Sequence, residues 1–173
     1  MYSLNALRIL EMKKKASRPR ISFIESGIKI KLPNRLNLKR FLIRMFGEEG
    51  TELESLTYVF CTDEYLLKIN QDFLQHDYLT DIISFPLSEP GQPVQGEIYI
   101  SYPRVIENAS TYQTPTLTEL HRVIFHGALH LCGYSDLSPE QKQEMTQMED
   151  KYLHSYGIVP RGTNPDTSFT QAT

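Results

Sequence analysis

One stretch of the chain, His126–Asp136, restricts the possible fold more than any other. On an α-helix, the four-residue spacing of His126 and His130 brings both side chains to one face, roughly 6 Å apart along the axis. Gly133 can adopt the left-handed conformation that ends a helix and turns the chain back. The turn is expected to bring Asp136 to the same point. The stretch therefore predicts a three-ligand metal site on a helix and the turn after it, with the open fourth position that catalytic zinc requires.

The residue after the first histidine limits which reactions this metal site can be expected to catalyse. Zinc proteases of the His-Glu-x-x-His type place a glutamate there as general base, whereas this chain has Gly127. The sequence therefore argues against peptide hydrolysis and identifies no catalytic base. Two histidines and a carboxylate also suit iron(II), although no co-substrate signature supports an oxygenase. A structural zinc in a non-catalytic assembly factor stays open, but a closed structural site uses four ligands and three are evident.

Charge is distributed unevenly along the 173 residues, whose net charge is −3. Residues 1–44 hold 12 of the 18 Lys and Arg but only 2 of the 21 acidic residues. A basic end on an otherwise acidic chain suggests a polyanionic partner. Within it, one predicted helix should hold cations on the face opposite its apolar side, and these are candidates for phosphate contacts: Arg35, Lys39, Arg40 and Arg44.

The length of the chain suits one domain with a substantial core. Residues 1–20 are expected to form a basic extension, residues 21–157 the folded domain, and residues 158–173 a disordered tail rich in Pro, Thr, Ser, Asn and Gln. The apolar runs are far below the ~20 residues of a membrane-spanning helix. The N-terminus does not have the pattern of a secretory signal, so a cytoplasmic location is expected.

Strands are predicted where apolar residues alternate with polar ones or form short continuous runs bounded by turn residues. Five segments fit: Ile21–Phe23, Ile28–Leu32, Leu56–Cys61, Thr80–Pro86 and Gly96–Ser101. The last two are expected to pair as an antiparallel hairpin. Helix-start signals predict four helices, and Asn37, Thr62 and Ser138 open the first, second and fourth. Two signals mark the start of the third, Thr114-Pro115 with a proline at the first position and the capping box Thr116-x-x-Glu119. The first of these helices should end at Gly47, and the third carries the histidine pair.

Two acidic residues in the predicted hairpin, Asp81 and Glu97, are further candidates for the site. Either carboxylate is suited to line a cleft or to accept a hydrogen bond from a ligating imidazole. Asp81 equally suits a turn or the start of a strand. The two acids are therefore predicted as possible site residues without an assigned role.

Three blocks of sequence, taken together, resemble a known family. They are residues 80–86 (TDIISFP), 96–101 (GEIYIS) and 126–134 (HGALHLCGY). In this order and spacing they resemble the YbeY-type rRNA maturation factors, metal-dependent endoribonucleases of bacteria, over roughly residues 21–156. The resemblance implies a single α+β domain in which a small, mostly antiparallel sheet packs against helices, and one zinc ion held by three side chains.

The same resemblance implies a function in RNA processing. It implies an endoribonuclease that matures the 3′ end of 16S rRNA and takes part in ribosome quality control. The implied partners are rRNA, the small ribosomal subunit and possible ribosome-associated proteins, with no membrane. The residues leave two alternatives open, a non-catalytic ribosome-associated factor with a structural zinc and a metal-dependent hydrolase of another substrate.

Two positions depart from the family pattern. The usual third ligand is a histidine, and here it is Asp136. Two neutral histidines and one aspartate leave a formal charge near +1 where three histidines leave +2, so the metal should be a weaker Lewis acid. The family also usually has an arginine where this chain has Leu74, directly after Phe73. That arginine is associated with RNA, so its replacement puts phosphate positioning in doubt.

Overall fold

The computed structural model describes residues 18–75 and 77–159. Most of the predicted basic extension and C-terminal tail therefore lies outside the described residues. The elements follow one another as β1 (Arg20–Glu25), α2 (Arg35–Glu48), β2 (Leu53–Cys61), α3 (Asp63–Leu74), β3 (Ile82–Pro86), β4 (Val94–Ser101), α4 (Tyr102–Thr111), α5 (Thr116–Leu131) and α6 (Pro139–Tyr156). The predicted α+β class and the single domain are confirmed, and α4 is a helix that the sequence reasoning did not predict.

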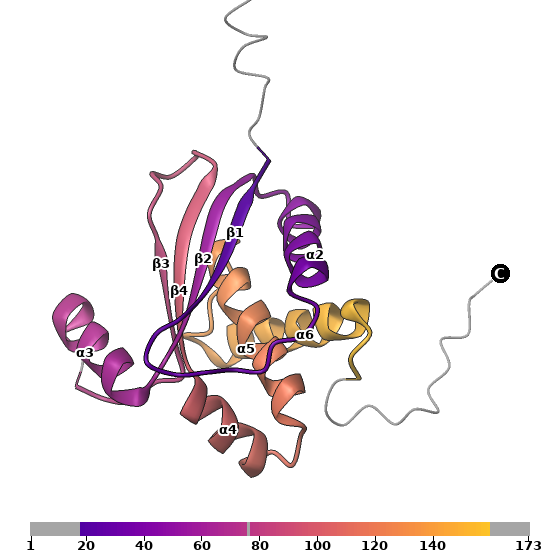
Figure 1. The fold of residues 1–173 in the computed structure, drawn as a ribbon. Coiled ribbons are helices and arrows are strands. Elements are labelled where there is room, and N and C mark those ends of the chain that lie inside the picture. Colours follow the sequence, from indigo (N-terminus) through magenta and orange to yellow (C-terminus); the bar gives the residue numbers. More distant parts are fainter. Residues whose placement is uncertain (1–17, 76, 160–173) are drawn as a thin grey trace, which may run out of the picture.

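The four strands form one mixed sheet in the order β1-β2-β4-β3. The predicted antiparallel hairpin of β3 and β4 is confirmed. The sheet is nevertheless mixed instead of mostly antiparallel, because β1 pairs with β2, and β2 with β4, in parallel. Parallel neighbours need a crossover connection, usually through a helix, and α2 provides one between β1 and β2 (Figure 1).

The segment Ile28–Leu32 was predicted as a strand, and this is wrong. It belongs to the crossover from β1 to α2 and pairs with no strand. Its alternation has another cause, since Leu32 is buried and Ile30 packs against the core while Lys29 and Lys31 are exposed. The alternation of apolar and polar residues in this segment therefore reflects which side chains are buried, and it does not indicate pairing in a sheet.

Helices cover both faces of the sheet unequally. The main core lies between the sheet and α2, α5 and α6, which stand to one side of the strands in Figure 1. A smaller cluster of Cys61, Leu66 and Ile83 packs under α3. Because successive side chains of a strand point to opposite faces, Ile98 of β4 faces α5 and Tyr99 faces the smaller cluster.

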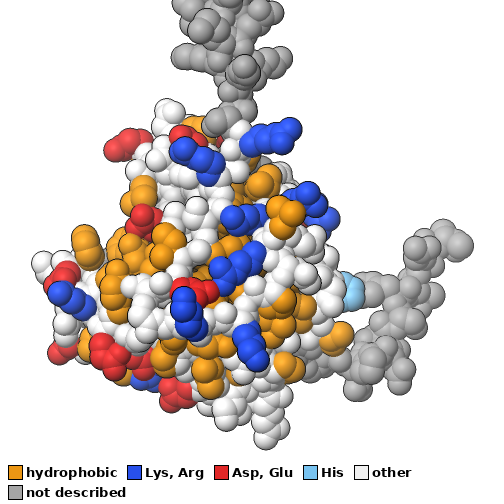
Figure 2. All heavy atoms as spheres, viewed as in Figure 1, with side chains coloured by type: hydrophobic (Ala, Val, Ile, Leu, Met, Phe, Trp, Pro, Cys, Tyr) orange, Lys and Arg blue, Asp and Glu red, His pale blue; other side chains and the backbone are white. Residues whose placement is uncertain are grey.

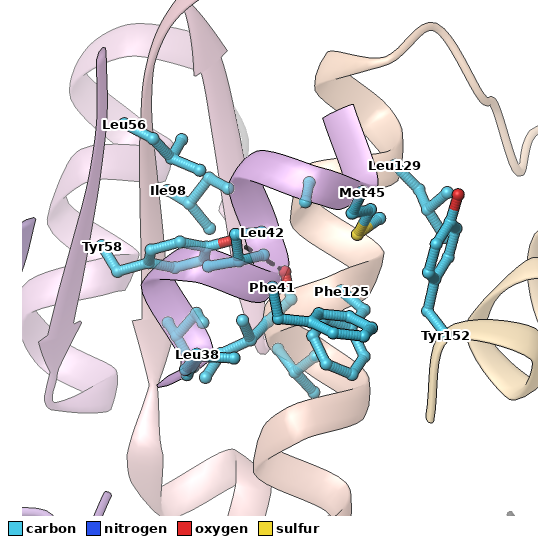
Figure 3. Packing of buried hydrophobic residues seen from close by; sticks show 14 of the residues in the cluster. Leu38, Phe41, Leu42, Met45, Leu56, Tyr58, Ile98, Phe125, Leu129 and Tyr152 are labelled. Atoms are coloured by element: carbon cyan, nitrogen blue, oxygen red, sulfur yellow. Dashed lines mark hydrogen bonds between the residues drawn. The ribbon is translucent and has the colours of Figure 1, made fainter. Parts of the chain in front are cut away.

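Aromatic side chains join α5 to the sheet and to α2 (Figure 3). The hydroxyl of the fully buried Tyr58 on β2 donates a hydrogen bond of 3.0 Å to the carbonyl of Ile124 on α5. The rings of Phe41 on α2 and Phe125 on α5 lie 5.2 Å apart between centroids. These contacts hold α5, the helix with the histidine pair, in a fixed position over the strands.

The helix boundaries depart from the prediction at two starts. Helix α2 begins at Arg35 after Asn34, so Asn37 lies inside it, and it continues through Gly47 to Glu48. Helix α5 has Pro115 as its N-cap and no side-chain capping bond, so the predicted capping function of Thr116 is also wrong. The capping box at Ser138 is confirmed. In the part of the chain that the structure describes, no helix is long and apolar enough to cross a membrane.

Candidate metal centre

Helix α5 brings the two histidines together on one face. The Nε2 atoms of His126 and His130 lie 2.9 Å apart, and their rings are perpendicular. The carboxylate of Asp136 lies 3.9 Å from each of these nitrogens. Among the described residues, these three side chains form the one group of His, Cys, Asp or Glu able to share a metal ion, with ligand atoms within 4.8 Å of one another.

The turn after α5 has the geometry that the sequence predicted. The helix ends at Leu131, and Gly133 adopts a φ of 100°, which lies in the left-handed region. The amide of Gly133 donates to the carbonyl of His130, and the amide of Tyr134 donates to that of Leu129. These two bonds reverse the chain, and the reversal brings Asp136 back beside the histidines.

The second nitrogen of each imidazole has its own partner. The Nδ1 of His130 lies 3.0 Å from the carbonyl oxygen of Tyr134, and the Nδ1 of His126 lies 2.8 Å from Glu149. A carbonyl oxygen only accepts hydrogen bonds, so the Nδ1 of His130 carries the proton and donates it. An ionised carboxylate also only accepts, so the Nδ1 of His126 donates to Glu149 in the same way. This arrangement leaves a lone pair on each Nε2, as a metal ligand requires.

The donor set fits a metal cation. Two Nε2 lone pairs that face each other at 2.9 Å repel unless a cation lies between them. Tetrahedral zinc with nitrogens at about 2.0–2.1 Å would separate such atoms to roughly 3.3 Å, which is a small adjustment. The carboxylate of Asp136, 38% exposed, supplies the negative charge on the open side.

The sequence reasoning missed the buried pair that supports His126. Glu149 on α6 accepts from His126 with one carboxylate oxygen and, at 2.8 Å, from Arg122 with the other. Arg122 also donates to Asp150 at 2.6 Å. Both Arg122 and Glu149 are at least nine-tenths buried. The sequence offered one signal for a carboxylate partner at this place. Arg122 lies one helical turn before His126 and therefore shares its face of the helix.

The environment shifts the pKa of the two histidines in opposite directions. Burial lowers the pKa of His126, but the hydrogen bond and the charge of Glu149, with smaller contributions from Asp136 and Asp81, outweigh it and raise the pKa. Burial and the neighbouring charge of His126 lower the pKa of His130. The pair therefore accepts one proton more readily than two, as expected for nitrogens that share one position.

A cavity of about 460 Å³ opens beside His126 and Asp136, between α4, α5 and α6. We call it the acidic cavity, because its lining includes the carboxylates of Asp81, Glu119, Asp136, Glu149 and Asp150. Its cation, Arg122, is paired with two of them. The predicted residue Asp81 is thus brought to the site, where its carboxylate accepts from the amide of Asn108 at 3.1 Å.

The second predicted acid, Glu97, is not brought to the site. It lies one residue before Ile98, whose side chain faces α5, so it points to the opposite face of the sheet. There its carboxylate accepts a hydrogen bond of 2.7 Å from the hydroxyl of Tyr99. The sequence located both acids on the hairpin, but only the sheet geometry separates their faces.

The four predicted phosphate-binding cations lie along α2. Figure 2 shows Lys and Arg side chains over this helix and the segment before it. Arg35 pairs with Glu25 at 2.5 Å, Lys39 lies over the ring of Phe23, and Arg44 pairs with Glu48. Arg40 is exposed. These cations surround neither the histidine pair nor the acidic cavity, whose lining comes from other elements.

Close packing explains the glycine between the histidines. A Cβ atom at Gly127 would lie 2.7 Å from Cδ1 of Ile82 and 2.8 Å from Cγ2 of Ile98. Real Cβ atoms do not make contacts this short, so any larger residue would force the side chains of Ile82 and Ile98 to shift, and glycine lets α5 lie this close to β3 and β4. The position that a zinc protease uses for its glutamate therefore faces the sheet.

The fold and the cluster define a small α+β protein with a candidate metal site made of two histidines and a carboxylate. The family model described as endoribonuclease YbeY matches residues 25–157, well over half of the chain. The chain belongs to this family, as the three sequence blocks predicted. Endoribonucleases are hydrolases that act on RNA phosphodiester bonds.

Relatives and a solved structure agree with this assignment. A protein named endoribonuclease YbeY from Cytophaga hutchinsonii is 41% identical over 133 residues, which cover 77% of this chain and 93% of the relative. One of the same name from Flavobacterium psychrophilum is 48% identical over 114 residues, covering 66% and 80%. The solution structure of a Thermotoga maritima protein superimposes with a TM-score of 0.54 at 26% identity, and the match covers 84% of this chain and 99% of that one.

Proposed function

We propose that this protein is a zinc-dependent endoribonuclease that binds one zinc ion through His126, His130 and Asp136. The observation that carries the proposal is the convergence of two Nε2 atoms and a carboxylate within 4.8 Å, while both Nδ1 atoms are occupied by acceptors. The chain's membership of an endoribonuclease family supports RNA as the substrate.

Different residues of the chain have different roles in such a site. Bound zinc supplies a Lewis acid that polarises a phosphoryl oxygen and lowers the pKa of a water. Glu149 and the carbonyl of Tyr134 keep the imidazole protons on Nδ1, so that both Nε2 atoms stay available. Asp81 lines the same cavity as His126 and Asp136, which supports a role in the cleft as a proton acceptor.

We extend the proposal to 16S rRNA, with maturation of its 3′ end and ribosome quality control as the cellular roles. The small ribosomal subunit and ribosome-associated proteins are then the partners, in the cytoplasm. The support is the resemblance of the three sequence blocks together with family membership. Substrate and partners follow the family, whereas the metal site follows the geometry of this chain.

Metal analysis combined with RNA cleavage tests the proposal. Protein purified without chelator should contain about one zinc per chain. It should cleave a fragment that carries the 3′ end of 16S rRNA, lose cleavage after treatment with a chelator, and regain it when zinc is restored. Recovery with iron(II) but not with zinc would contradict the proposal. So would cleavage that persists in metal-free protein.

Histidine in place of Asp136 should keep the metal. The side chain of Asp136 is 38% exposed, so the larger imidazole has room at the open side of the site. Zinc held by three neutral donors is a stronger Lewis acid. We expect Asp136→His to retain about one zinc per chain and to cleave RNA at least as fast as the wild type. Loss of zinc from Asp136→His would contradict this expectation, and an unchanged zinc content in Asp136→Ala would argue against Asp136 as a ligand.

Charge reversal on α2 tests its proposed role in RNA binding. The variant Lys39→Glu/Arg40→Glu/Arg44→Glu removes three cations that could neutralise phosphates. Binding of a labelled rRNA fragment should weaken by more than roughly tenfold at low salt, with a shallower dependence of the binding constant on salt. The matched control is Lys68→Glu on α3, outside this helix. Equal binding by the triple variant and the wild type would mean that α2 presents only a solvated face.

A further inference from the structure

The candidate metal centre has a second opening, on the side of His130. This hollow of about 330 Å³ lies between the end of α3 and β3. We call it the neutral hollow, since its described lining residues include no Lys, Arg, Asp or Glu. Their side chains are instead apolar, hydroxyl, amide or aromatic, as in Asn70, Tyr78, Thr80, Ile82, Ser84 and His130.

The two openings differ in what they can accept. The acidic cavity carries five carboxylates, and its one arginine is paired with two of them. The phosphate groups of an RNA strand are repelled from such a lining. The described lining of the neutral hollow carries no carboxylate, and it combines an apolar wall at Ile82 with the hydroxyls of Thr80 and Ser84. This mixture suits a flat, partly polar ring.

Tyr78 stands at the rim of the neutral hollow with its side chain largely in solvent, 59% exposed. Its backbone is held in place, because the buried amide of Asn70 donates a 2.8 Å hydrogen bond to the Tyr78 carbonyl. A second bond of 2.7 Å joins Gln71 of α3 to Asp77. An exposed aromatic ring on an anchored segment is the usual platform on which proteins stack unpaired bases.

We propose that the neutral hollow is a nucleobase subsite: it takes the base of a nucleotide adjoining the scissile phosphate in single-stranded RNA, stacked on Tyr78. His130 belongs to both the metal centre and the lining of the hollow. A phosphate at the metal therefore has its neighbouring base at the hollow, while the strand avoids the acidic cavity. The inference rests on the proposed endoribonuclease function.

Steady-state cleavage of a single-stranded rRNA oligonucleotide by zinc-loaded protein tests the subsite. Tyr78→Ala should raise KM roughly tenfold and leave kcat within about twofold, because base–aromatic stacking contributes about 1–3 kcal/mol to binding. Tyr78→Phe keeps the ring and should restore the wild-type KM. The matched control is Tyr65→Ala, which removes an exposed tyrosine of α3 that stacks near Tyr99 on the other face of the sheet.

Abasic nucleotides then identify the group that is bound. Once the cleaved bond is mapped, an abasic nucleotide on one side of it should raise KM for the wild type, and the same change should have little effect on Tyr78→Ala. An unchanged KM for Tyr78→Ala, or equal abasic effects in both proteins, would overturn the subsite. Wild-type protein that cleaves no RNA would instead refute the proposed function, so the two failures are distinguishable.

Discussion

Alanine in place of His126 is expected to abolish zinc binding at physiological concentrations and to reduce RNA cleavage by at least roughly a thousandfold. The substitution removes one of three donors and leaves two, which is too few for a stable catalytic zinc. Lewis-acid stabilisation is worth several kcal/mol, and each 1.4 kcal/mol corresponds to a factor of ten in rate. Zinc content measured after dialysis and initial cleavage rates provide the readouts.

The fold should survive this substitution, which makes the result interpretable. Glu149 loses His126 but keeps its bond to Arg122, so it is not left unpaired in the interior. His154→Ala is the matched control, since His154 is an exposed histidine near the end of α6. Equal cleavage by wild type and His126→Ala would show that the activity comes from a contaminating nuclease or that the metal is not catalytic.

Alanine in place of Glu149 is expected to damage both stability and metal binding. Glu149 is 8% exposed, and its carboxylate bonds to Arg122 and His126. Breaking a buried ion pair by removing one partner typically costs about 3–5 kcal/mol, because the other charge stays buried. Because Arg122 keeps its bond to Asp150, we expect a loss at the lower end of this range. The free energy of unfolding measured with urea should fall by about 3 kcal/mol. Loss of the acceptor on His126 Nδ1 should weaken zinc binding roughly 10- to 100-fold.

Two companion variants separate these effects. Glu149→Gln still offers His126 a carbonyl acceptor but no charge to Arg122, so it should lose stability and keep most of its zinc affinity. Asp150→Asn alters the more exposed partner of Arg122, 33% exposed, and should change stability by at most about 1 kcal/mol. Wild-type stability and zinc affinity in Glu149→Ala would show that the buried chain of contacts does not support the site.

The parts of the site that follow local rules could be predicted from the sequence. A four-residue spacing on a helix and a glycine that reverses the chain place His126, His130 and Asp136 without any knowledge of the rest of the fold. Glu149 follows no such rule, since it reaches His126 only because α6 packs across α5. Nothing in the spacing of 23 residues indicates that contact.

The sheet shows the same division between local and distant information. Short apolar segments bounded by turn residues located β1, β2, β3 and β4, and the Pro- and Gly-rich loop after β3 predicted its antiparallel pairing with β4. Such local patterns do not indicate which strands are neighbours, so the parallel pairing of β2 with β1 and β4 was not predicted. They also do not indicate which face is buried against α5, and so Asp81 and Glu97 appeared equivalent until the sheet separated them.

The close approach of α5 to the strands has a consequence for how this site compares with other zinc sites. A glutamate at position 127 would have to enter the space that Ile82 and Ile98 fill. A single substitution at this position therefore does not by itself give a site of the His-Glu-x-x-His type, since the side chains of Ile82 and Ile98 would have to move first. Two zinc architectures that share a histidine spacing thus differ in the packing behind the metal-binding helix, because here the residue after the first histidine lies against the sheet.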